Sequence, residues 1–252
     1  MTKRQAFAAL AALGFACFAG NAVADNHGDA NLADLWMVEV KDGMDEQFRN
    51  AFQKHIEFRK KKGDTRAYRT YAPVIGDDLS YYAIRYCCFA YADIDAYNAW
   101  AAEAKTGDHW NDNVDQYVES YQHRLQTIDF DNSNWPEEDD HFQLYGVTTY
   151  KHKMGRAMQI EASKAALVNA AREGEWPHHW SFMRDVGGRN AVGLVIPHEN
   201  YADMAPPEES FGEFLTRHHG QEKAMEMLTD WTDNFVATNY TVYRYMPDMS
   251  MD

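Results

Sequence analysis

Two stretches of this chain, residues 35–130 and 142–252, follow the same order of elements, β-α-β-β-α-β. In each stretch a strand precedes a helix, two strands meet at a glycine-marked turn, a helix breaks near its middle, and a last strand follows. Two copies of such an order are hard to obtain by chance. The repeat therefore constrains the fold more than any single motif does.

The first unit is predicted from alternating and helical patterns. Its predicted strands are 35–41, 67–75, 81–91 and 127–130. Its predicted helices are 44–59, 93–105 and, after a break near Gly107, 112–126. The prediction of a helix over 112–126 rests on Val114, Val118 and Leu125, which recur at helical spacing.

The second unit repeats the order after an acidic linker over 131–141, which contains Pro136. Its predicted strands are 144–151, 179–186, 191–197 and 241–245. Its predicted helices are 158–173, 208–220 and 225–236. The residues before the first unit, 25–34, are expected to form a flexible N-terminus of the mature protein.

Each unit has the split pattern of a ferredoxin-like sandwich, in which both helices cover one face of an antiparallel sheet. The other face also carries apolar and aromatic residues, which cannot be left in water. We therefore expect an α+β fold of two tandem ferredoxin-like units, whose sheets pack together into an intramolecular α/β barrel. About 228 residues can bury a core of sufficient size.

In topology and pattern the sequence resembles the dimeric α/β-barrel superfamily in its tandem form. This superfamily includes stress-responsive barrel proteins, antibiotic-biosynthesis-type monooxygenases, NIPSNAP-like proteins and chlorite dismutase-like haem proteins. The resemblance covers most of the mature chain but no motif of one branch. It implies a ligand site between sheet and helices or inside the barrel, and fold alone does not give function.

The N-terminus reads as a secretory signal peptide over 1–24. Lys3 and Arg4 precede an uncharged apolar stretch, and a small-x-small cleavage signal ends at Ala24. No later segment is apolar for long enough to cross a membrane. We expect an exported bacterial protein, periplasmic or secreted, that is not inserted in the membrane.

The acidic charge of the chain argues against nucleic acids and anionic membrane surfaces as partners. Cleavage would remove two positive charges and no acid, which takes the net charge from −15 to −17. Nucleic acids and anionic membranes attract basic proteins instead. A chain that closes its own barrel is expected to be a monomer (a pseudo-dimer) or to form a homodimer through edge strands.

Cys87 and Cys88 are the only cysteines after the signal peptide. Neighbouring side chains of a strand point to opposite faces, so an ordinary disulfide between them is geometrically awkward. Two buried free thiols are therefore expected, with a vicinal disulfide as the alternative.

Arg85 is the first candidate site residue. It lies in the middle of a predicted strand, on the same side as Tyr81 and Cys87. A buried arginine needs an anionic partner. That partner is either Glu39, in which case the pair is structural, or the carboxylate or oxyanion of a ligand.

The other candidates come from the second unit. His179, Asp185 and His198 lie on neighbouring predicted strands or at their ends, and a histidine near a carboxylate can move a proton. The alternative interpretation is ordinary polarity around a hairpin. His179 and Asp185 share one face of their strand, because residues of even separation do so.

No metal site is predicted, because neither HExxH nor CxxC occurs and adjacent histidines point apart. No cofactor is predicted either. Haem stays an alternative through the resemblance, and it would need an axial histidine. His152, His198 or His218 would serve.

Aromatic residues make up 14% of the chain. Most must be core, and a cavity among them would suit a flat apolar or aromatic ligand. The first hypothesis is a cofactor-independent monooxygenase- or isomerase-like enzyme, with Arg85 binding an oxyanion and His179 or His198 moving a proton. The alternatives are a non-catalytic ligand-binding or stress-response barrel and a haem-binding barrel.

Overall fold

The computed structural model describes residues 30–136 and 142–251, so the predicted signal peptide and its cleavage site lie outside the described residues. The strands are β1 Leu32–Val40, β2 Arg69–Ile75, β3 Tyr81–Phe89, β4 Val118–Asn134, β5 Leu144–His152, β6 Trp180–Val186, β7 Ala191–His198 and β8 Phe235–Tyr245. The helices are α1 Asp45–Lys61, α2 Asp93–Ala104, α3 Thr106–Asn113, α4 Ala157–Glu173, α5 Phe211–His219 and α6 Gln221–Thr232. Short 3₁₀ turns are Asp115–Tyr117, Ala202–Met204 and Pro247–Met249.

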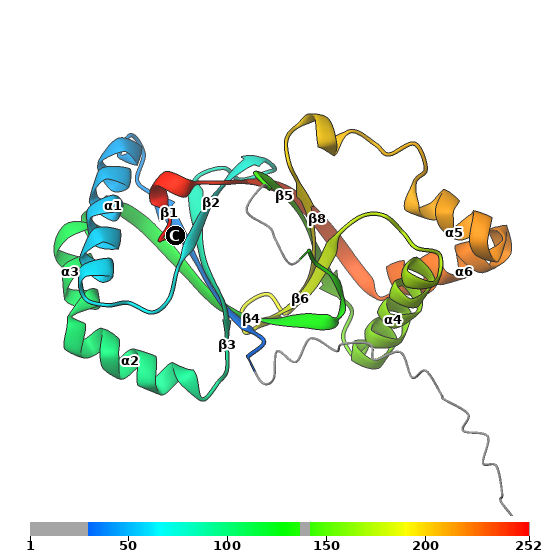
Figure 1. Ribbon diagram of the computed structural model, residues 1–252, viewed down its shortest axis with the longest axis horizontal. Helices are drawn as coiled ribbons and strands as arrows, with labels where there is room; N and C mark the ends of the chain where they lie inside the picture. Colours follow the sequence, from blue (N-terminus) through cyan, green and yellow to red (C-terminus); the bar gives the residue numbers. More distant parts are fainter. Residues whose placement is uncertain (1–29, 137–141, 252) are drawn as a thin grey trace, which may run out of the picture.

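The strands form a closed antiparallel barrel in the order β1-β3-β2-β8-β5-β7-β6-β4 (Figure 1). Read around the barrel, β4-β1-β3-β2 is followed by β8-β5-β7-β6, so both halves have the same internal order. The expected α+β class and intramolecular barrel are confirmed. The order is consistent with a tandem ferredoxin-like fold.

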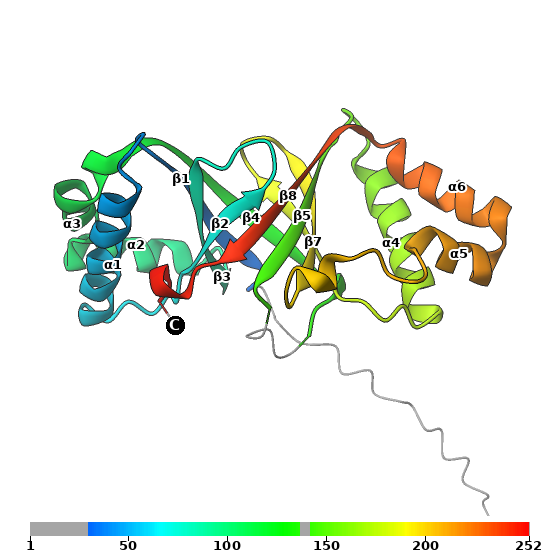
Figure 2. The ribbon, with the colours of Figure 1, turned by 90° about the horizontal axis from the view of Figure 1, so that it is seen from above.

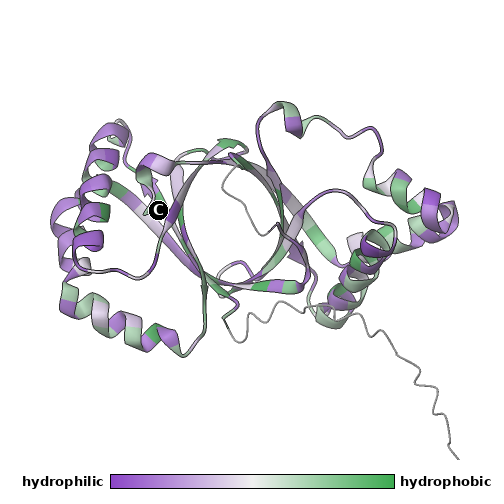
Figure 3. Cartoon of the chain, in the orientation of Figure 1, coloured by the Kyte–Doolittle hydropathy of each residue, from purple (hydrophilic) through white to green (hydrophobic). Residues whose placement is uncertain are grey.

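The helices form two layers on opposite sides of the barrel, with α1 to α3 on one side and α4 to α6 on the other (Figures 1 and 2). Each layer packs on the outer face of the strands through its own apolar core. Phe48 and Phe52 of α1 meet Val38 and Tyr82 in the first core. In the second, Phe214, Trp231 and other aromatic side chains meet β6 and β7. The helices are largely hydrophilic elsewhere (Figure 3).

Within the described residues, no helix has the length and apolar character that a membrane crossing requires.

The largest difference from the sequence prediction concerns β4. Residues 118–134 form one strand, so the helix predicted over 112–126 is wrong beyond Asn113. β4 pairs with β1 along its first part and with β6 along its second part. These ladders outweigh the helical spacing of Val118 and Leu125, because strand formation depends on cross-strand packing more than on local pattern.

Three smaller boundaries also shift. β1 begins at Leu32, so residues 32–34 of the expected flexible N-terminus are strand. Residues 131–134 of the expected linker continue β4. Phe235 and Val236 begin β8 instead of ending a helix.

Cys87 and Cys88 are joined by a vicinal disulfide across a cis peptide bond. The expectation of two buried free thiols is therefore wrong, and both residues are only partly buried.

A pair of histidines, of which His55 is buried and His109 is partly buried, joins α1 to α3. His55 is 2% exposed, and its Nδ1 lies 3.1 Å from Nδ1 of His109. One ring must donate and the other must accept, which requires a neutral nitrogen. Burial, and then the charges of Arg59 and His109, lowers the pKa of His55 to about 3.

This pKa makes stability depend on pH. An unfolded histidine titrates near ~6.5, so the unfolded chain takes up the proton before folded His55 does. The stabilisation is complete above about pH 6.5 and is lost as the pH falls toward the folded pKa. Between these values we expect His55 to contribute a slope of up to about 1.4 kcal/mol per pH unit to the free energy of unfolding. Urea unfolding at pH 7 and at pH 4.5 measures this change in the free energy of unfolding. The variant His55→Phe should show a shallower dependence, and equal slopes would contradict the assignment.

Candidate functional site

The strands of the barrel have an outer face under the helices and an inner face. Val38, Tyr82 and Ile84 belong to the helix-side core, so the residues that alternate with them point inward. Arg85 and Asp185 both lie on the inner face by this rule. Asp185 Oδ1 accepts a hydrogen bond of 3.1 Å from Gln126 Nε2. Glu39, the anion considered for Arg85, accepts one of 2.6 Å from Ser120.

The two predicted histidines lie elsewhere. His179 directly precedes β6, and its Nδ1 lies 3.3 Å from the carbonyl oxygen of Asn134. Asp185 is near the other end of the same strand, which six residues of strand place about 20 Å away. His198 ends β7 on the outer face, with Nδ1 3.6 Å from Asp203. The structure thus does not gather the four predicted residues into one site.

A different histidine is held directly by a carboxylate. Asp34 of β1 and His123 of β4 lie on the outer faces of paired strands, and Nε2 of His123 is 2.7 Å from Oδ1 of Asp34. Asp34 is buried, while 44% of the His123 side chain is exposed. A carboxylate only accepts hydrogen bonds, so Nε2 carries the proton of the neutral ring and Nδ1 is the basic nitrogen.

The second oxygen of Asp34 is fixed from the protein side. Oδ2 accepts hydrogen bonds of 3.3 Å from Arg66 Nη1 and from the Tyr68 hydroxyl. Arg66 is 6% exposed, and its guanidinium lies 3.6 Å from the ring centroid of Tyr97. The carboxylate is therefore positioned by buried groups, which leaves it little freedom to move away from His123.

Aromatic side chains lie beside His123. The rings of His123 and Trp36 are stacked, with centroids 4.1 Å apart and planes 13° apart. Tyr121 meets Trp36 edge-on, and its hydroxyl accepts a hydrogen bond of 2.9 Å from Trp110 Nε1. Trp36 is 37% exposed and Tyr121 41% exposed. Burial, and then the hydrogen bond to Asp115, raises the pKa of Tyr121 to about 12, so it remains a neutral phenol.

Together these residues form what we call the outer-face dyad, Asp34 and His123, with Trp36 and Tyr121 as its wall. A histidine oriented by a carboxylate and open to solvent on one side can accept a proton from a bound molecule. Partly exposed aromatic faces can hold a flat ring next to it.

Sequence reasoning missed the dyad because it assigned Asp34 to a flexible segment and His123 to a helix. A signal was available in residues 121–125, where Tyr121, His123 and Leu125 alternate with the polar residues Gln122 and Arg124 as they would in a strand.

The described residues do not fit a haem in the helical layer of the second half. The Nε2 atom of His152 is buried with no hydrogen-bond partner in the described chain, as an axial ligand would require. However, Trp180, Phe182 and Trp231 fill the space between sheet and helices. A Cβ added at Gly174 would lie 2.4 Å from the Phe214 ring, so α4 and α5 are also closely packed where α4 ends.

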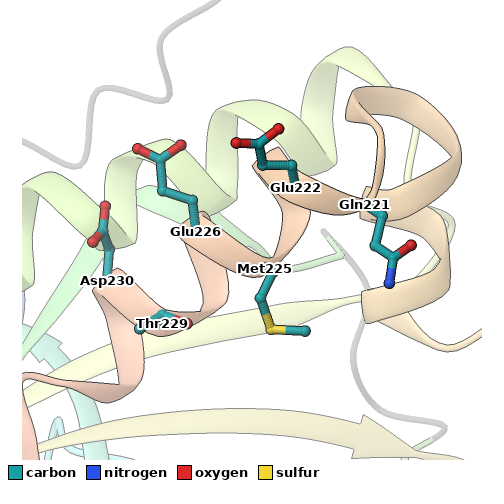
Figure 4. Close-up of a pocket in the computed structure, with 6 residues that line it drawn as sticks. All are labelled: Gln221, Glu222, Met225, Glu226, Thr229 and Asp230. Atoms are coloured by element: carbon teal, nitrogen blue, oxygen red, sulfur yellow. The ribbon is translucent and has the colours of Figure 1, made fainter.

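No group of three or more potential metal ligands is present in the described part of the chain. A hollow on α6 is lined by Gln221, Glu222, Met225, Glu226, Thr229 and Asp230 (Figure 4). Its carboxylates lie on an exposed helix, and Glu226 is paired with Lys223 at 2.9 Å. It contains none of the histidines discussed above.

Comparison with known proteins supports the fold. A candidate monooxygenase from Lactobacillus acidophilus superposes with a TM-score of 0.53 at 8% identity, over 88% of this chain and 95% of that chain. An anthrone oxidase-like protein gives 0.50 at 10%, over 86% and 92%. A second candidate monooxygenase, from Fusobacterium nucleatum subsp. nucleatum, gives 0.54 at 10%, over 86% and 92%. No family model and no curated protein matches the sequence.

Substitution of the two dyad residues should lower the free energy of unfolding by different amounts. Asp34→Ala would leave the buried guanidinium of Arg66 without its anion, which should lower the free energy of unfolding by about 3–5 kcal/mol. His123→Gln removes a half-exposed ring and should cost less than about 1 kcal/mol. Chemical denaturation of both variants measures the difference. Similar costs for the two would contradict the view that His123 is free of a structural role.

Proposed function

We propose that this protein is a cofactor-independent oxygenase-like enzyme that removes a proton from a flat aromatic substrate. The observation that carries the proposal is the contact of 2.7 Å between His123 Nε2 and the buried carboxylate of Asp34, beside a half-exposed indole. His123 takes the role of base that the sequence analysis gave to His179 or His198. The names of two similar structures, a candidate monooxygenase and an anthrone oxidase-like protein, agree with this class of chemistry.

In the proposed reaction the substrate lies against Trp36 and Tyr121, and Nδ1 of His123 accepts its acidic proton. Asp34 stabilises the imidazolium that forms and keeps the ring in place. The resulting carbanion reacts with dioxygen. For an anthrone-type methylene, the carbon loses two hydrogens and gains one oxygen as a carbonyl, and the second oxygen leaves as water. Dioxygen is the oxidant, and no cofactor enters the balance.

Oxygen consumption with anthrone as the probe tests the proposal. His123→Gln should lower kcat/KM by about a hundredfold or more, which is the usual contribution of a general base. Trp36→Leu should raise KM more than it lowers kcat, because the indole is proposed to bind the ring. His198→Gln is the matched control, since His198 also lies beside a carboxylate, and it should leave the rate unchanged.

Three outcomes would contradict the proposal. The first is a wild-type protein that does not consume oxygen with anthrone. The second is undiminished activity of His123→Gln. The third is a loss of activity in His198→Gln alone, which would return the role of base to one of the two residues, His179 or His198, that the sequence analysis named.

We also propose export to a bacterial periplasm or the medium, supported by the charge, apolar stretch and cleavage signal of residues 1–24. Protein recovered from a periplasmic fraction should begin at Asp25 when its N-terminus is sequenced. Full-length protein confined to the cytoplasm would contradict this proposal.

A further inference from the structure

The inner face of the barrel contains an unusual amide. Gln126 is 5% exposed and lies on the inner face of β4, opposite Asp185 of β6. Its Nε2 donates to Asp185, which fixes the orientation of the amide, because the reverse would set its oxygen against a carboxylate. Its Oε1 is buried with no hydrogen-bond partner among the described residues. A buried acceptor left unsatisfied is costly, so this atom requires a donor.

A buried cation lies two residues away on the same face. Arg124 is 6% exposed and donates to the side-chain oxygen of Gln122. The turn between β6 and β7 lies against it, since a Cβ added at Gly188 would be 3.3 Å from its Nε. Burial, and then the charge of Arg189 in the same turn, lowers the pKa of Arg124. The positive charge of Arg189 therefore acts on buried Arg124 at this end of the barrel, and an anion close to Arg124 would offset it.

Two tyrosine hydroxyls complete the polar lining. Tyr81 of β3 and Tyr243 of β8 are 2.6 Å apart, oxygen to oxygen, across strands that are not neighbours. Burial raises the pKa of both, and Arg189 and Arg124 act in the opposite direction on Tyr243. In such a pair one hydroxyl donates to the other, and the acceptor keeps its own proton for a third group.

Solvent reaches part of this face. Leu35, Met37 and Glu39 share the inner face of β1 and are only partly buried. An inner face with this exposure and this set of polar groups differs from the dry, apolar filling of many small barrels.

We propose that the inner face beside the β6–β7 turn binds a small oxyanion that also carries a hydroxyl group. Arg124 and a hydroxyl of the Tyr81–Tyr243 pair donate to the anionic oxygens, and the hydroxyl of the ligand donates to Gln126 Oε1. Hydroxy-carboxylates and hydrogen phosphate share this chemistry.

This site is distinct from the outer-face dyad. His123 and Arg124 are neighbours on β4 and point to opposite faces, so a ligand of the inner face does not touch the proposed base. Binding of an oxyanion on the inner face can therefore be tested independently of the proposed oxygenase activity.

Calorimetric titration of the full chain with three probes tests the proposal. 3-Hydroxybenzoate carries a carboxylate and a hydroxyl that cannot donate to that carboxylate, benzoate lacks the hydroxyl, and inorganic phosphate tests the other source of the same chemistry. Wild-type protein should bind 3-hydroxybenzoate more tightly than benzoate. Gln126→Met should weaken 3-hydroxybenzoate about tenfold and change benzoate little, because only the hydroxyl uses the amide oxygen. Tighter binding of phosphate than of 3-hydroxybenzoate would identify phosphate as the ligand class.

Two further variants keep the test decisive. Tyr243→Phe removes one hydroxyl without changing the shape of the side chain, and it should weaken both carboxylates. Arg184→Gln on the outer face of β6 is the matched control and should leave all affinities unchanged. The proposal is overturned if wild-type protein binds none of the probes, which would mean that water alone satisfies Gln126, or if Gln126→Met binds 3-hydroxybenzoate as tightly as wild-type protein does.

Discussion

The pairing of β4 with two partners is the constraint on which the rest of the structure depends. This strand runs from Val118 to Asn134 and pairs first with β1 of its own half and then with β6 of the other half. Together with the β2–β8 ladder, it joins the two halves into a closed sheet. A closed sheet has no free edge, so the backbone groups of both halves are satisfied within the chain. Buried Lys164 of α4 then pairs with Asp129, which attaches the second helical layer to the far end of the same strand.

Closure also separates two chemical environments. The outer face is covered by two helical layers and needs apolar side chains, as the cores around Phe48 and Phe214 show. The inner face can hold polar groups because they pair across the barrel, as Tyr81 does with Tyr243. Successive residues of a strand alternate between these environments. Hence one tripeptide of β4, Gln122-His123-Arg124, contributes to an aromatic wall on one face and to a cationic lining on the other.

This alternation explains what could be predicted from the sequence and what could not. The strands with apolar outer residues and glycine turns, such as 81–91 and 191–197, were predicted close to their observed bounds. The helices around Phe48 and Leu167 were predicted for the same reason. Only residues 127–130 of β4 were predicted as strand, because the inner residues before them, Gln122, Arg124 and Gln126, are polar. The apolar residues of this first part of β4 matched a helical period by accident. Both candidate sites involve β4, so the error in one element concealed them.

Three described histidines, His55, His198 and His123, differ in whether their environment meets the requirements of the proposed base. His55 is buried against His109 and near Arg59, and its low pKa keeps it neutral without access to a substrate. His198 has a carboxylate at 3.6 Å, but the side chain of Asp203 is 50% exposed and its Oδ2 accepts a hydrogen bond of 3.1 Å from the backbone N–H of Glu199. At His123 the arrangement is the opposite of that at His198, because the carboxylate of Asp34 is buried and the imidazole of His123 is exposed. A base must meet its substrate while its orienting group stays fixed, and only this arrangement of the three meets both requirements.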